Sequence, residues 1–233
     1  MEIPMKTTAQ GVQEQMLPFD AFLAPGASPM PFEPNGLEAM SDVDLLAILL
    51  RDRLAPALIL HEFASIGEAA SATTADFILR TGLDQNAHAM LQAGRELAAR
   101  LAKQPLVKRQ VLTSWDALIS YLRIRAANEQ REQVRILYLD KRNQLIRDEI
   151  AGTGTVDHAP VYVREVMHRA LNLGASAIIM THNHPSGDPT ASQGDIAMTK
   201  ALVDAGKVLN IAVHDHVVVG RDGIYSFRQK GLI

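Results

Sequence analysis

Cysteine is absent from the 233-residue sequence, which excludes a disulfide framework and a closed thiolate metal site. The absence is typical of proteins of the reducing cytoplasm. Long hydrophobic runs are also missing, since a run such as Leu45–Leu50 is far too short to span a bilayer. Residues 1–6 lack the basic start and apolar core of a signal peptide. We therefore expect a cytoplasmic protein without membrane association.

A large excess of charge is missing as well, because the formal net charge is only −3. This argues against a strongly basic nucleic-acid binder but leaves local basic patches open. Apolar residues make up 47% of the sequence, which is enough for real cores in one large or two modest domains. Nothing in the sequence indicates an oligomeric state.

Composition and periodicity distinguish three regions. Residues 1–35 contain six prolines and no sustained period, which predicts a flexible N-terminal arm. Residues 36–103 carry short helical patterns separated by glycines, which predict a small all-helical domain whose first helix is capped by Ser41. We interpret Lys103–Pro105 as the linker into a second domain, residues 104–233.

The second domain mixes helical and strand patterns. Alternating apolar residues predict a hairpin from two strands, 132–140 and 144–150. Strands interleaved with helices then predict an α/β (α+β) fold, in which helices flank a mixed sheet. The other expected elements are helices at 114–127, 164–173 and 192–205, and strands at 175–180, 208–213, 216–220 and 224–227.

A pair of histidines follows the apolar strand at 175–180. His182 and His184 are spaced i, i+2 on an extended segment, so both rings project to one side and can meet one ion at roughly 2.0–2.1 Å. Asp195 could supply a third ligand after a tight loop, which leaves a position open for water, as in catalytic zinc sites. The alternative for the histidines alone is two polar loop residues. Ser192-x-x-Asp195 is also a capping box, and this role is compatible with metal binding.

These residues resemble a known family. His182-x-His184-Pro185, a fixed gap and Ser192-x-x-Asp195 are similar to the signature of JAMM (MPN+) zinc metalloproteases, and the stretch His182–Pro189 resembles the bacterial RadC family. The resemblance implies an MPN/JAB-like domain, a zinc ion and an upstream glutamate that acts as general acid and base.

By its position in that resemblance, the catalytic glutamate is Glu132. Spacing alone does not select it over Glu129, Glu149 or Glu165, and a solvated charge at the strand edge is the alternative. The resemblance also gives Ser192 a catalytic role, as a hydrogen-bond donor to a developing oxyanion. Its capping role could instead occupy that hydroxyl.

A second His-x-His lies at His214-Asp215-His216. Asp215 and His216 resemble the pair found at this place in the family, which leaves His214 incidental. We favour a role for this pair in structure or in orienting a ligand imidazole over direct binding of the metal.

The helical domain resembles the N-terminal half of RadC-like proteins, where a helix-hairpin-helix turn is expected. Such a turn uses two glycines, so that backbone amides can approach a phosphate. Here the turn is the degenerate Thr81-Gly82-Leu83-Asp84, which weakens the case for nucleic-acid binding and favours a scaffold or docking domain.

Three functions are therefore open. The first is a zinc-dependent hydrolase of peptide or isopeptide bonds, whose partner is a peptide or protein substrate. The second is a DNA-associated accessory protein of repair or recombination, in which the MPN domain is a platform. The third is a catalytically silent scaffold, which the complete set of proposed ligands disfavours.

Overall fold

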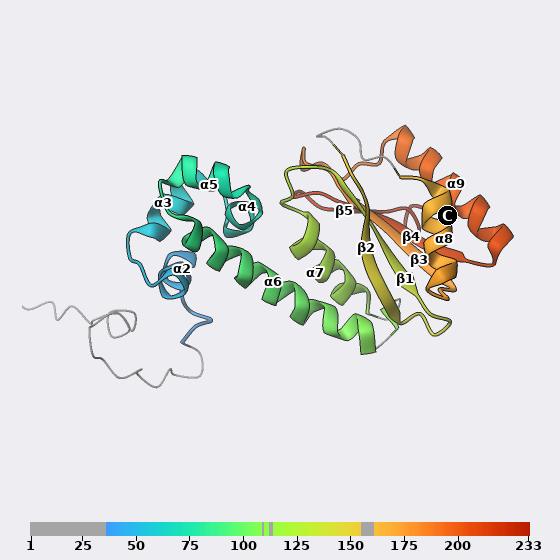
Figure 1. The fold of residues 1–233 in the computed structure, drawn as a ribbon, viewed down its shortest axis with the longest axis horizontal. Coiled ribbons are helices and arrows are strands. Elements are labelled where there is room, and N and C mark those ends of the chain that lie inside the picture. Colours follow the sequence, from blue (N-terminus) through green and yellow to red (C-terminus); the bar gives the residue numbers. More distant parts are fainter. Residues whose placement is uncertain (1–35, 109, 112–113, 155–160) are drawn as a thin grey trace, which may run out of the picture. The chain divides into compact units, whose positions relative to one another are not determined.

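The computed structural model describes residues 36–108, 110–111, 114–154 and 161–233, and Figure 1 shows their fold. The arm expected at residues 1–35 lies outside the described residues. Contacts divide the chain into two compact units, one ending at His61 and the other beginning at Glu62, and each is described by itself. The domain boundaries expected from the sequence stay a prediction.

The first unit contains helix α2 (Asp42–Leu50) and most of α3 (Ala55–Glu62). The expected cap at Ser41 is confirmed, because its hydroxyl accepts from the amide of Asp44 while the Asp44 carboxylate accepts from the amide of Ser41. This capping box satisfies two amides that the first turn of a helix leaves without partners.

The second unit starts with three helices, α4 (Ile66–Ser71), α5 (Thr74–Thr81) and α6 (Gln85–Lys108). Helix α4 is not predicted by the sequence pattern, which instead predicts a linker at Lys103–Pro105. That linker is wrong, because α6 continues through Pro105 to Lys108. The helix continues because Ala99 and Leu106 are fully buried in one apolar cluster, which holds this segment against the sheet.

The centre of the second unit is a five-stranded mixed sheet, which confirms the expected fold class. The strands lie in the order β2-β1-β3-β4-β5, and only β3 and β4 pair in parallel. Asn143, with φ of 58°, turns the expected hairpin between β1 and β2. The strands are β1 (Gln133–Leu139), β2 (Leu145–Thr153), β3 (Ala177–Asn183), β4 (Ala212–Val219) and β5 (Ile224–Ser226).

Helices cover both faces of this sheet (Figure 1). Helix α7 (Trp115–Ala126) and the end of α6 pack on one face, around Leu118, Leu122 and Leu137. Helices α8 (Val163–Asn172) and α9 (Gln193–Leu209) pack on the other, around Ile136 and other buried residues. No helix in the part of the chain that the structure describes is long and apolar enough to cross a membrane.

The strand expected at 208–213 is wrong. Val208 and Leu209 extend α9, and Val208 is 82% exposed, so it has no buried face to contribute to a sheet. Gly206 does not end the helix, which continues to Leu209 and has Asn210, with φ of 55°, as its C-cap. The chain then turns back past Gly206. A Cβ atom at Gly206 would lie 2.3 Å from the carbonyl oxygen of Ile211. The two strands expected at 208–213 and 216–220 are therefore one strand, β4.

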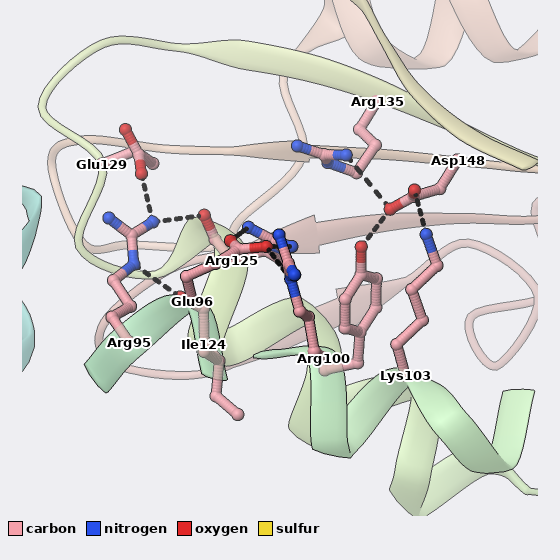
Figure 2. Close-up of polar contacts among 10 residues, drawn as sticks. Arg95, Glu96, Arg100, Lys103, Ile124, Arg125, Glu129, Arg135 and Asp148 are labelled. Carbon is pink, nitrogen blue, oxygen red and sulfur yellow. Dashed lines mark hydrogen bonds and ion pairs between the residues drawn. The ribbon is translucent and has the colours of Figure 1, made fainter. Parts of the chain in front are cut away.

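A part-buried polar network ties α6 and α7 to the sheet (Figure 2). The Asp148 carboxylate on β2 accepts from Lys103 Nζ at 2.5 Å, from Arg135 Nη1 at 3.1 Å and from the Tyr121 hydroxyl. Opposite charges and a neutral donor thus compensate the burial of this carboxylate.

Candidate metal centre

Three side chains converge where β3 ends and α9 begins. His182 and His184 come from the end of β3 and the residue that follows it, and Asp195 from the first turn of α9. The two Nε2 atoms lie 2.9 Å apart, and Asp195 oxygens lie 3.2 Å from Nε2 of His182 and 3.7 Å from Nε2 of His184. Ligand atoms at tetrahedral positions around zinc are separated by about 3.3 Å, since each bond is about 2.0–2.1 Å. These three groups could therefore hold one metal ion.

The hydrogen bond of His184 fixes its tautomer. Its Nδ1 atom lies 2.9 Å from the carbonyl oxygen of Asp188. A carbonyl only accepts, so Nδ1 carries the proton, and in the neutral ring Nε2 presents its lone pair.

A chain of hydrogen bonds fixes the tautomer of His182 in the same way. The Thr199 hydroxyl donates to the carbonyl oxygen of Asp195 at 2.6 Å, so its oxygen accepts from Nδ1 of His216, also at 2.6 Å. Nε2 of His216 then accepts from Nδ1 of His182 at 2.7 Å. This direction leaves Nε2 of His182 without a proton. The two Nε2 atoms that face each other are both lone-pair donors, which is the donor set that a cation needs.

The capping box predicted at Ser192 is confirmed, and its acid is the proposed ligand. Oδ2 of Asp195 accepts from the amide and from the hydroxyl of Ser192, both at 2.7 Å, while the Ser192 oxygen accepts from the Asp195 amide. Oδ1 of Asp195 faces His182. One carboxylate thus caps α9 and faces the histidines, and the Ser192 hydroxyl proton points at that carboxylate.

The environment sets the charges that metal binding requires. Burial lowers the pKa of His182 to about 4, and it lowers the pKa of His216 well below the usual range. Burial raises the pKa of Asp195, but the adjacent His184 and His182 and the hydrogen bonds from Ser192 outweigh it and hold this pKa well below the usual range. The Asp195 carboxylate raises the pKa of His184, because it stabilises a proton on Nε2 that a metal ion would have to displace. His182 is therefore neutral and Asp195 ionised near pH 7.

Glu132 lies in the same cavity as the three groups. Val134 on β1 pairs with His182 on β3, and Glu132 precedes this pair on one strand as His184 follows it on the other. The two side chains line the same cavity, and the charge of Glu132 contributes to the raised pKa of His184. Glu132 is only 8% exposed, and its carbonyl accepts from the Gly154 amide at 2.8 Å. The cavity of about 430 Å³ is lined by Glu132, Val134, Val161, Met180, His182, His184, Pro185, Ser186, Ser192, Gly194, Asp195, Met198 and His216.

The other three candidate glutamates lie elsewhere. Glu129 pairs with Arg95, and Glu149 pairs with Arg169. Glu165 is exposed on α8. Of the four acids that the sequence left open, the structure brings Glu132 alone to this cavity.

The two histidines of the second His-x-His, His214 and His216, have different surroundings. Nε2 of His214 lies 2.7 Å from Oδ1 of Asn143, away from the cavity. His216 contacts His182 and stacks on Phe227 with ring centroids 4.5 Å apart. Buried Asp215 accepts from Ser226 and from backbone amides, including that of His216. This arrangement fits the interpretation that His216 orients a ligand.

Sequence reasoning missed two residues of this centre, Thr199 and Phe227. Thr199 could have been found, because it follows Asp195 by four positions and so lies on the same face of α9. Phe227 could not, because its contact with His216 depends on the pairing of β4 with β5.

The turn between α5 and α6 carries an acid where a phosphate would bind. Gly82, with φ of 72°, ends α5, and Oδ1 of Asp84 accepts from the amide of Ala87 at 2.9 Å. The start of α6 thus already has an anionic cap, which repels phosphate. DNA binding by this region stays a prediction. The acidic cap at this turn argues against it.

A mixed sheet with helices on both faces, and a His-x-His with a distal aspartate beside it, define a JAB-type domain. In agreement, residues 112–232 match the family described as RadC-like JAB domain. A UPF0758 protein of Rhodobacter capsulatus is 44% identical over 209 residues, which cover 87% of this chain and 98% of the relative. The chain belongs to the RadC (UPF0758) family.

Proposed function

We propose that this protein is a zinc-dependent hydrolase of peptide or isopeptide bonds. The observation that carries the proposal is the pair of Nε2 lone pairs on His182 and His184, 2.9 Å apart, beside the Asp195 carboxylate. Two lone pairs at that distance repel each other unless a proton or a metal ion lies between them, and burial disfavours a charged His182. A buried glutamate in the same cavity supplies the proton-transfer group that amide hydrolysis needs.

His182, His184 and Asp195 would hold the ion. When bound, zinc supplies Lewis acidity, which lowers the pKa of water towards about 7 and polarises a carbonyl. Glu132 takes a proton from the attacking water and returns it to the nitrogen of the leaving amine. This return is what allows an amine to leave, because an amide anion is too basic to depart.

The walls of the cavity support a peptide substrate. Val134, Val161, Met180 and Met198 line it together with the polar groups of the proposed site. Apolar walls with a few placed polar groups are typical of substrate sites, and they exclude bulk water around the reacting bond.

Elemental analysis followed by a cleavage screen tests the proposal. Purified wild type should contain about one zinc per chain, and Asp195→Ala should contain little. Cell extract incubated with zinc-loaded wild type should then show new peptide amino termini, or newly freed lysine ε-amines, that are absent with Glu132→Gln. A wild type that stays metal-free after exposure to zinc, or cleavage products shared with Glu132→Gln, would contradict the proposal.

A further inference from the structure

Asn183 lies between the two histidines in the sequence, but its side chain points to the opposite face of the sheet. Side chains alternate along β3, so His182 faces the cavity while Asn183 points towards the side covered by α7. Asn183 is only 1% exposed. A buried carboxamide must find hydrogen-bond partners, and its partners reveal its role.

All the partners of Asn183 lie on one short segment of the chain. Oδ1 accepts from the amide of Gln133 at 2.9 Å. Nδ2 donates to the carbonyl oxygens of Glu129 at 3.2 Å and Arg131 at 3.1 Å. These three backbone groups lie on both sides of Glu132. One side chain therefore holds the backbone before and after the proposed acid and base.

Arg95 of α6 holds the same segment from another direction (Figure 2). Its guanidinium donates to the carbonyl oxygens of Ile124 at 3.0 Å and Arg125 at 2.9 Å, at the end of α7, and it pairs with the Glu129 carboxylate. Glu129 also accepts from the side chain of Gln133 at 3.3 Å. Residues 129–133 are thus held by β3 and by α6.

We propose that Asn183 is a positioning residue, which holds residues 129–133 so that Glu132 stays in the cavity that His184 also lines. The ion pair between Arg95 and Glu129 is the second anchor of this segment. The catalytic consequence rests on the proposed function, whereas the restraint on the backbone does not. The sequence thereby places in one tripeptide, His182-Asn183-His184, the proposed metal ligands and the group that holds the proposed base.

Asn183→Ala tests this role with three measurements on the full chain. Amide hydrogen exchange at Gln133 should become at least about tenfold faster, because its acceptor is lost. Zinc content should stay at the wild-type value, since no proposed ligand is changed. With a peptide substrate from the cleavage screen, kcat should fall by about 100-fold while KM stays within about threefold, as expected when a reacting group is misplaced by about 1 Å.

Two further variants make the result specific. Asn183→Asp keeps the shape and the acceptor for the Gln133 amide but loses both donors, so it should retain slow exchange at Gln133 and lose part of kcat. It also serves if Asn183→Ala does not fold. Asn172→Ala removes an exposed asparagine on α8, whose Nδ2 lies 3.2 Å from Nε2 of His168, and it should match wild type in all three measurements.

The possible outcomes separate this proposal from the proposed function. Unchanged exchange at Gln133 in Asn183→Ala would overturn the positioning role, whatever the activity. Loss of zinc together with kcat would overturn it as well, because Asn183 would then support the ligands rather than Glu132. If wild type cleaves no substrate but exchange at Gln133 accelerates in Asn183→Ala, the proposed function fails and the restraint by Asn183 stands.

Discussion

Nδ1 of His182 lies 2.7 Å from Nε2 of His216, and both rings are buried. His216 is held in turn by Thr199 and by stacking on Phe227. The bond directs the Nε2 lone pair of His182 towards His184 and Asp195. His216, which is not one of the three proposed ligands, thus orients one of them.

Replacing His216 should weaken metal binding without removing a proposed ligand. His216→Phe keeps an aromatic ring against Phe227 but leaves Nδ1–H of His182 without an acceptor. We expect zinc affinity to fall by about 10–100-fold, measured by competition with a chelator. His214→Phe is the matched control, because His214 contacts Asn143 outside the cavity, and it should bind zinc as wild type does. Equal affinity for both variants would contradict the role given to His216.

Ser192 and Ser41 form the same capping box in different places, which allows their roles to be compared. Ser192→Ala and Ser41→Ala should each lower the free energy of unfolding by about 1 kcal/mol, measured by urea titration, because each removes a cap. Only Ser192→Ala should also weaken zinc binding, since its hydroxyl donates to Oδ2 of Asp195. With zinc saturating, we expect kcat to stay within about tenfold of wild type; a loss of about 100-fold or more would instead indicate donation to an oxyanion.

The carboxylate of Asp148 should contribute strongly to stability, because its side chain is only 7% exposed and contacts Lys103, Arg135 and Tyr121. Asp148→Asn leaves the part-buried Lys103 and Arg135 without their counter-charge, and we expect a loss of about 1–3 kcal/mol in the free energy of unfolding. Tyr121→Phe removes one neutral donor from the same network and should cost about 1 kcal/mol.

The effect of Asp148 should depend on pH in one direction. Burial raises its pKa, but hydrogen bonds from Lys103 and Tyr121 and the charge of Arg135 outweigh burial, so the pKa in the folded protein is lowered. The stabilisation is then fully present above the unfolded pKa of about 3.9 and is lost as pH falls towards the folded value. Urea titrations of wild type and Asp148→Asn should differ by a constant amount from pH 7 to about pH 5 and converge below about pH 4. A difference that grows on acidification would contradict this assignment.

The absence of a side chain at Gly220 allows the loop that follows His184 to pack closely against the backbone of this residue. A Cβ atom at Gly220 would lie 2.0 Å from the carbonyl oxygen of Gly187, which is backbone and cannot rotate away. We expect Gly220→Ala to lower the free energy of unfolding by about 1–3 kcal/mol, as measured by urea titration. Gly223→Ala is the control, because its Cβ would meet only the Pro189 ring at an ordinary 3.6 Å. Equal stability of the two variants would show that the loop adapts without cost.

The spacing of residues in the sequence could not identify Glu132 as the acid that lies in the cavity. Glu129, Glu132, Glu149 and Glu165 are all acids near predicted strand or helix ends, and no local pattern separates them. The antiparallel register of β1 and β3, in which Val134 faces His182, carries Glu132 into the cavity. Register depends on which strands pair, and that is decided by the whole sheet rather than by either strand alone.

The errors in the predicted elements have a similar cause. Residues 208–213 have apolar residues suited to a strand, but α9 continues through Leu209 because tertiary packing decides its length. Lys103–Pro105 has the composition of a linker, but buried Leu106 and the bond from Lys103 to Asp148 hold it in a helix. Local composition does not report such contacts.

The sequence by itself determined the mixed α/β class, the strand that leads into His182 and His184, and the capping box of Ser192 and Asp195. These features depend on residues at most four positions apart, whose geometry the backbone sets directly. Only the tertiary structure decided that Glu132 lines the same cavity as His184, that His216 and Thr199 fix the tautomer of His182, and that Asn183 binds residues 129–133. Those contacts join residues that are far apart in the chain, and they exist only because strand pairing and helix packing bring their elements together.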